Sequence, residues 1–128
     1  MIAVDTNVLV RILVDDPGQP GQVAAARTLA SQAKQVFLPL IVQVEAVRVL
    51  QSGYGLPREG VVRALEYLEV NEALQSEDED LCHRALALFR SSNVDYSDCL
   101  ILANCRARDL KLYTFDKRLG KLTGATRS

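Results

Sequence analysis

Short apolar stretches alternate with longer helical stretches along the chain, and this alternation constrains the fold most strongly. Four stretches have the length of short buried strands, at 1–4, 36–39, 70–76 and 110–116. The segments between them are typical of helices, at 7–15, 22–35, 41–52, 57–69, 77–92 and 95–109. Strands that alternate with helices form a parallel sheet with helices on both faces. The sequence therefore predicts an α/β fold around a central parallel sheet.

The length and composition fit one domain over residues 1–128. Apolar residues make up 48% of the chain, which is enough for one sizeable core. Neither an internal repeat nor a low-complexity segment interrupts it. The last residues, 117–128, are polar and contain two glycines, so we expect this end to be frayed.

Charge is distributed unevenly although the whole chain carries only −1. Residues 1–104 contain 8 Lys/Arg and 14 Asp/Glu, a net charge of −6. Residues 105–128 contain 7 Lys/Arg and 2 Asp/Glu, a net charge of +5. This basic end is either an ordinary solvated surface or a rim that attracts phosphates beside an acidic site.

The cysteines indicate a reducing cytoplasm, and the N-terminal residues lack the pattern of a signal peptide. Cys82, Cys99 and Cys105 are odd in number and include no closely spaced pair, which argues against a disulfide framework and a zinc ribbon. No basic segment precedes an apolar one at the start, and no apolar run reaches about 18 residues. We therefore expect neither a signal peptide nor a membrane span.

Four carboxylates stand where a pocket is expected. Asp5 ends the first predicted strand and Asp116 ends the fourth, so both fall at the same edge of a parallel sheet. Glu45 and Asp98 interrupt apolar helical stretches, at positions where core-facing residues are expected. Four converging carboxylates repel one another, and Mg²⁺ or Mn²⁺ would remove the conflict. His83 is the only histidine, so an imidazole-rich zinc site is not available.

Each carboxylate also has a local structural interpretation. Asp5 could cap the helix that follows it, and Asp116 could cap or turn the chain after its strand. Glu45 could pair with Arg48 one turn later. Asp98 could form a box with Asp95, which is well placed as the N-cap of the helix at 95–109. These alternatives stay open from the residues alone.

Four segments together resemble the PIN-domain ribonucleases, and in particular the VapC-type toxins of bacterial toxin–antitoxin pairs. They are "VDTNVLV", "VQVEAVRVL", "DYSDCLILANC" and "LYTFDKRL", and the resemblance spans residues 1–119. It implies a three-layer α/β/α sandwich around a parallel sheet. It also implies an acidic quartet with polar supporting residues, which are Asp5, Glu45, Asp98, Asp116, Asn7 and Thr114. Asp95 matches a neighbouring acidic position of many members.

The resemblance implies a metal-dependent endoribonuclease. Asp5, Asp98 and Asp116 would hold Mg²⁺ or Mn²⁺, and Glu45 would orient the attacking water or ligate a second ion. The expected products carry a 5′-phosphate and a 3′-hydroxyl. Thr6 and Asn7 would fix Asp5 by hydrogen bonds.

The expected partners are RNA, a cognate antitoxin and a second copy of the chain. Lys117 and Arg118 are the better candidates for binding RNA phosphates. Arg11 and Arg48 are weaker candidates because ion pairs with nearby acids would explain them. The antitoxin would insert a basic tail into the acidic pocket. Helices 8–14 and 40–50 could form a homodimer surface, although their pattern suits the core equally well.

The sequence departs from the family pattern at its C-terminal end, and two other functions are also considered. Family members commonly end with one more strand, and only "TGATRS" remains after Leu122, so that strand is expected to be missing, truncated or disordered. A PIN-like module that binds metal or RNA with little turnover is the alternative function. A receiver-like phosphoacceptor domain also clusters acids at strand ends, but Asp5 lacks the acidic neighbour that such a site needs.

Overall fold

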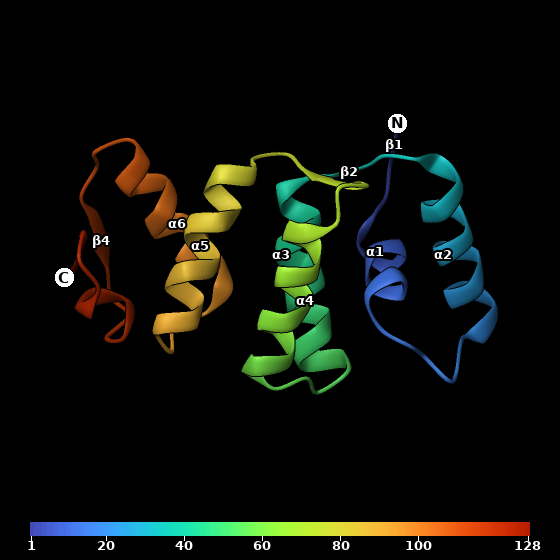
Figure 1. Cartoon of the computed structure of the whole chain (residues 1–128). Helices are drawn as coiled ribbons and strands as arrows, with labels where there is room; N and C mark the ends of the chain where they lie inside the picture. Colours follow the sequence, from blue (N-terminus) through green and yellow to red (C-terminus); the bar gives the residue numbers. More distant parts are fainter. The chain divides into compact units, whose positions relative to one another are not determined.

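The chain forms two compact units in a computed structural model that describes residues 1–128. We call residues 1–79 unit 1 and residues 80–128 unit 2. Each unit consists of helices and short parallel strands (Figure 1), which confirms the predicted α/β class. The expectation of one domain over residues 1–128 stays a prediction. No helix combines the length and apolar character that crossing a membrane would require.

Unit 1 contains a three-stranded parallel sheet. Its order is β1 (Ile2–Ala3), β2 (Val36–Leu38) and β3 (Leu74–Ser76), with β2 in the middle. The carboxyl ends of all three strands lie at one edge because the strands are parallel. Asp5 follows β1 at this edge, and Glu77 follows β3 there.

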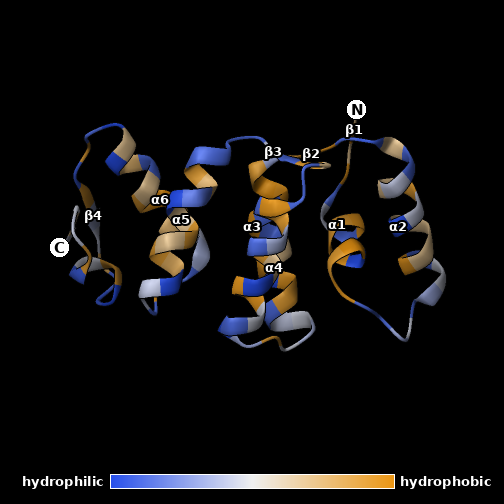
Figure 2. Cartoon of the chain, viewed as in Figure 1, coloured by the Kyte–Doolittle hydropathy of each residue, from blue (hydrophilic) through white to orange (hydrophobic).

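The helices of unit 1 begin at residues that favour helix starts. They are α1 (Thr6–Leu13), α2 (Pro20–Ala33), α3 (Leu40–Arg48) and α4 (Arg58–Val70), with a π-helical turn, η1 (Val49–Gly53), after α3. Asp5 caps α1, and Pro20 occupies the first position of α2, where its missing N–H costs nothing. The fully buried side chains come from helices and strands alike, and include Leu9, Val10, Val36, Leu38, Leu50 and Val61. Figure 2 shows hydrophobic residues, in orange, along α1 and α3.

Two predicted helices differ in detail from those observed. The helix expected at 41–52 is α-helical only to Arg48, because the Tyr54 N–H donates to the Val49 carbonyl at 3.2 Å and closes a wider turn. The helix expected from residue 77 begins at Glu79. Glu77 instead accepts a hydrogen bond from the Leu40 N–H at 3.1 Å, and so its carboxylate stabilises the start of α3.

Unit 2 contains two helices and a two-stranded parallel sheet. The elements are α5 (Glu79–Ser91), α6 (Tyr96–Ala107), β4 (Leu112–Thr114), the 3-10 turn η2 (Leu119–Lys121) and β5 (Ala125–Arg127). α5 begins one residue before the boundary of this unit. Phe89 packs edge-on against Tyr96, with ring centroids 5.7 Å apart. Both rings are buried, and they form the centre of this core.

The final strand is present, contrary to the expectation that it is missing, truncated or disordered. β5 pairs with β4 along its length, and the Ser128 N–H donates to the Thr114 carbonyl at 2.7 Å. A three-residue strand needs little sequence, and Gly124, with φ of 94°, provides the turn before it. Gly120 lies so close to β5 that a Cβ there would be 2.7 Å from the Arg127 Cβ.

The helices considered for a homodimer contribute mainly to the core of unit 1. Leu9 and Val10 of α1 are fully buried, as are Ala46 and Val47 of α3 to within a few per cent. Ile41 is the exception, with 68% of its surface exposed. The core therefore accounts for most of the apolar pattern, and a homodimer stays a prediction.

Candidate functional site

The predicted acidic quartet is divided between the two units. Asp5 and Glu45 belong to unit 1, whereas Asp98 and Asp116 belong to unit 2. Within each unit, no three Asp, Glu, His or Cys side chains lie close enough together to hold a metal ion by themselves. The four-carboxylate site stays a prediction, and each half is described in its own unit.

Asp5 serves as the N-cap of α1, which was one of its two interpretations. Its Oδ1 accepts a hydrogen bond from the Val8 N–H at 3.1 Å, and the side chain is exposed. Neither Thr6 nor Asn7 donates a hydrogen bond to Asp5 in this structure, and their supporting role stays a prediction. The reason is geometric, because an N-cap carboxylate reaches the backbone N–H groups two or three residues later. The Asp5 Oδ2 accepts no hydrogen bond from the chain.

Glu45 lies about a turn and a half into α3 and is partly buried. The predicted pair with Arg48 does not form, and Arg48 is exposed. The Glu45 side chain makes no hydrogen bond within the chain either, so both of its carboxylate oxygens are free of contacts with the fold.

Asp98 lies near two other carboxylates of unit 2, those of Asp95 and Asp116. It occupies the first turn of α6, where burial and the charges of Asp95 and Asp116 raise its pKa. Asp95 is the N-cap residue of α6, as predicted, but its side chain makes no capping hydrogen bond. The Asp95 charge is therefore not used by the helix start and adds to the repulsion on Asp98.

Asp116 follows β4 and is held by the turn after it. Its Oδ1 accepts from the Leu119 N–H at 2.8 Å, and its own N–H donates to the Thr114 Oγ1 at 3.0 Å. Thr114 thus fixes the backbone that carries Asp116. Lys117 and Arg118, the predicted phosphate contacts, come next in the chain and are exposed.

Arg11 is engaged inside unit 1, which is the ion-pair alternative that the sequence left open. Its Nη1 donates to the Tyr54 hydroxyl at 3.3 Å, and its Nη2 lies 3.8 Å from the Asp16 Oδ2. The Tyr54 hydroxyl donates to the same Asp16 oxygen at 2.8 Å. This hydrogen bond is the main reason that the pKa of Asp16 is lowered. Nothing in the sequence pattern indicated this triad of Arg11, Tyr54 and Asp16.

Unit 1 contains a cavity of about 340 Å³ beside Asp5 that sequence reasoning missed. Asp5 and Asn7 line it from the start of α1, and Gln22 and Ala25 line it from α2. Residues 22, 25, 26 and 29 follow helical spacing along one face of α2, which is the signal that could have indicated it.

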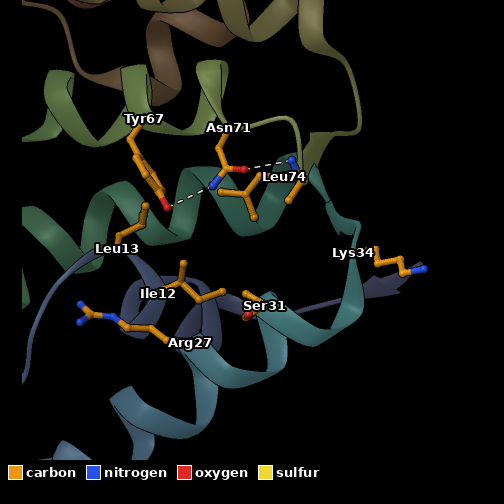
Figure 3. A pocket seen from close by; sticks show the side chains of 10 residues that line it. Ile12, Leu13, Arg27, Ser31, Lys34, Tyr67, Asn71 and Leu74 are labelled. Carbon is orange, nitrogen blue, oxygen red and sulfur yellow. Dashed lines mark hydrogen bonds between the residues drawn. The ribbon is translucent and has the colours of Figure 1, made fainter.

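A larger cavity, of about 560 Å³, lies at the other edge of the unit 1 sheet (Figure 3). Lys34 and Leu74 line it, close to the amino ends of β2 and β3. Asn71 donates to the Tyr67 hydroxyl at 3.0 Å and accepts from the Ala73 N–H at 2.9 Å, as the dashed lines of Figure 3 show. No predicted site residue lines this cavity.

Comparison with known proteins identifies the family. The family model described as PIN domain matches residues 2–125, so the chain belongs to the PIN-domain family. The structure is similar to the crystal structure of Mycobacterium tuberculosis VapC20, described as a sarcin-ricin loop cleaving toxin. The identity is 19%, the similarity covers 94% of this chain and 93% of that one, and the TM-score is 0.46. No curated protein matches the sequence. Family membership supports nuclease activity in general.

Proposed function

We propose that the chain is an Mg²⁺- or Mn²⁺-dependent endoribonuclease that acts as the toxin of a type II toxin–antitoxin pair. The proposal assigns Asp5, Glu45, Asp98 and Asp116 to one acidic site. The observation that carries it is membership of the PIN-domain family over residues 2–125. Burial and two neighbouring carboxylates also raise the pKa of Asp98, which supports a cation at this group. A divalent cation would relieve such a conflict.

The donor chemistry of these residues fits Mg²⁺ or Mn²⁺. Carboxylate oxygens are the hard ligands that both ions prefer. Asp5 uses only its Oδ1 to cap α1, and Glu45 makes no contact that would occupy its oxygens. When bound, the ion would lower the pKa of a water molecule and offset negative charge at the phosphorus centre.

The chain's own residues then divide the remaining work. Asp5, Asp98 and Asp116 would hold the cation, while Glu45 would orient the attacking water or ligate a second ion. The water oxygen would bond to phosphorus and lose a proton to solvent as the bond from phosphorus to the 3′ oxygen breaks. The leaving oxygen would take up a proton from solvent, which gives a 3′-hydroxyl and a 5′-phosphate.

Supporting residues position the acids and the RNA. Thr114 holds the backbone of Asp116 through its Oγ1. Lys117 and Arg118 are exposed beside Asp116 and would contact the phosphates that flank the cleaved bond. Arg11 is the weakest of the predicted RNA contacts, because Tyr54 and Asp16 already hold its guanidinium.

The proposed partner is an antitoxin with a basic tail. An arginine of that tail would form charge-assisted hydrogen bonds with the same carboxylates that bind the cation. It would therefore inhibit by competing with the metal ion. A homodimer and a cytoplasmic location complete this proposal.

The test is cleavage of total RNA with Mg²⁺ or Mn²⁺ by the wild type, Asp5→Asn and Asp98→Asn. Asparagine is as good an N-cap as aspartate, so Asp5→Asn removes charge and keeps the start of α1. We expect both variants to lose at least about a hundredfold in cleavage rate, comparable to the loss of one essential electrostatic group. Asp109→Asn is the matched control, because Asp109 is exposed and its φ of 57° suits asparagine.

Equal cleavage by the wild type, Asp5→Asn and Asp98→Asn would refute the assignment. RNA binding by a wild type that does not cleave would favour the binding module instead. Circular dichroism of each variant checks that loss of activity is not loss of fold.

A further inference from the structure

The 340 Å³ cavity of unit 1 lies between α1 and α2, with Asp5 at its border. α1 and α2 pack side by side in this unit (Figure 1). Because Asp5 is the first member of the proposed acidic site, whatever occupies this cavity lies next to the reacting phosphodiester.

The cavity exists because small side chains face it from α2. Ala25 and Ala26 leave space that longer side chains would fill, and Val8 and Leu29 supply further apolar surface. Leu29 is 43% exposed, which is high for a leucine next to a core helix. An apolar ligand that covers Leu29 would remove this surface from water.

Two amides supply the polar part of the cavity. Gln22 and Asn7 are both exposed, and the side-chain amide of neither residue forms a hydrogen bond with the chain. Each amide offers donors and an acceptor side by side, which is the pattern that the edge of a nucleobase presents.

The charge of the cavity disfavours a phosphate. Asp5 contributes a carboxylate, and the positive charge of Arg11 is offset by Asp16 at 3.8 Å. The Tyr54 hydroxyl also holds the Arg11 guanidinium. A neutral, flat ligand with a polar edge therefore suits this cavity better than an anion does. The volume lies at the lower end of the range for small-molecule sites, about 300–1,000 Å³.

We propose that the cavity between α1 and α2 binds one unpaired base of the RNA substrate, next to the cleaved bond, with Gln22 reading its edge. This inference rests on the proposed function, because it takes the substrate to be RNA. Single-stranded RNA presents such splayed bases, and apolar or aromatic surfaces hold them. The cavity then determines which base stands beside the cleavage point.

The first experiment measures base binding without cleavage. The full chain in EDTA is titrated with adenosine, guanosine, cytidine and uridine while backbone amide NMR shifts are recorded. We expect saturable shifts in α1 and α2 with at least one nucleoside. Ala25→Leu should weaken this binding by at least about tenfold, because the longer side chain would fill the space that the base needs. Ala24→Leu is the matched control, because Ala24 is exposed on the same helix and does not line the cavity.

The second experiment measures base preference during cleavage. A random RNA library is cleaved with Mn²⁺, and the ends of the products are sequenced. Ala25→Leu and Gln22→Ala should reduce the preference at one position beside the cut by about tenfold. Ala24→Leu and Gln32→Ala, which change exposed residues elsewhere on α2, should leave it unchanged.

The outcomes separate this inference from the proposed function. Nucleosides that leave α1 and α2 unshifted overturn the inference, and so does a preference that Ala25→Leu leaves intact, even if the wild type cleaves RNA. A wild type that does not cleave refutes the proposed function, and the nucleoside titration then decides the inference alone.

Discussion

The pKa of one aspartate in unit 1 is lowered, whereas the pKa of one aspartate in unit 2 is raised. In unit 1, Asp16 accepts hydrogen bonds from Tyr54 and from the Gly18 N–H, and its pKa is lowered. In unit 2, burial and the charges of Asp95 and Asp116 raise the pKa of Asp98. Donors within unit 1 therefore stabilise the ionised Asp16 carboxylate, whereas in unit 2 burial and neighbouring negative charges disfavour the ionised form of Asp98. The proposed cation would therefore relieve Asp98, whereas Asp16 has no such need.

The largest expected effect concerns the response to metal ions. Mg²⁺ or Mn²⁺ should stabilise the wild type, by about 2.7 kcal/mol when the free ion is at 100 times its Kd. Asp98→Asn should lose most of this stabilisation because it removes a proposed ligand. Asp16→Asn should keep it, since Asp16 serves the fold of unit 1. Thermal unfolding with and without the ion measures the difference, and an equal response from both variants would contradict the contrast.

An effect of intermediate size should follow from removing the donor that satisfies Asp16. Tyr54→Phe deletes the hydroxyl that donates to Asp16 and accepts from Arg11. We expect a loss of about 0.5–1.5 kcal/mol in the free energy of unfolding, the usual net range for one hydrogen bond, because Asp16 and Tyr54 are only partly buried. Urea titration measures it. Tyr113→Phe is the control, since Tyr113 is 64% exposed and its hydroxyl makes no hydrogen bond, and an equal loss there would count against the triad.

The smallest expected effect is the pH dependence of Asp98→Asn and Asp16→Asn, measured by urea titration in EDTA. The folded pKa of Asp98 lies above its ordinary value of 3.8, so between these two pKa values the folded chain binds more protons than the unfolded chain. Wild-type stability from this group falls as the pH rises through that interval. Asp98→Asn should therefore become more stable relative to the wild type as the pH rises, by a small margin because Asp98 is only partly buried and water screens its charge.

The sign reverses for Asp16. Its folded pKa lies below 3.8, so its stabilisation is complete above that pH and is lost as the pH falls through the folded pKa. Asp16→Asn should be less stable than the wild type at neutral pH, and the two should converge on acidification. If the stability of both variants, relative to the wild type, changed with pH in the same direction, the opposite pKa shifts of the two aspartates would be contradicted.

Local sequence signals predicted the alternation of strands and helices and placed most helix starts close to those observed. Asp5 caps α1, as one of its two interpretations had it, whereas α2 begins at Pro20, before the predicted start at residue 22. The alternation of strands and helices predicted parallel pairing, which both sheets show. Such features depend on a few neighbouring residues, so the sequence contains enough information to find them.

Features that depend on distant contacts could not be read in advance. The hydrogen bond between Tyr54 and Asp16 joins residues 38 positions apart, and no periodicity indicates it. Glu77 was expected in the first turn of α5, but Leu40 of another helix binds it. The cavity beside Asp5 depends on how α1 packs against α2, so the helical spacing of residues 22, 25, 26 and 29 could indicate only the face of α2 that lines it.

The contact between Gly120 and β5 bears on how this sequence can change over time. Any other residue at position 120 would bring a Cβ within 2.7 Å of the Arg127 Cβ and 3.2 Å of its Cα. Relief would require the backbone of β5 to shift, and β5 is the strand that pairs with β4 just before Asp116. A substitution of Gly120 during evolution would therefore be tolerated only together with a rearrangement of the C-terminal strand.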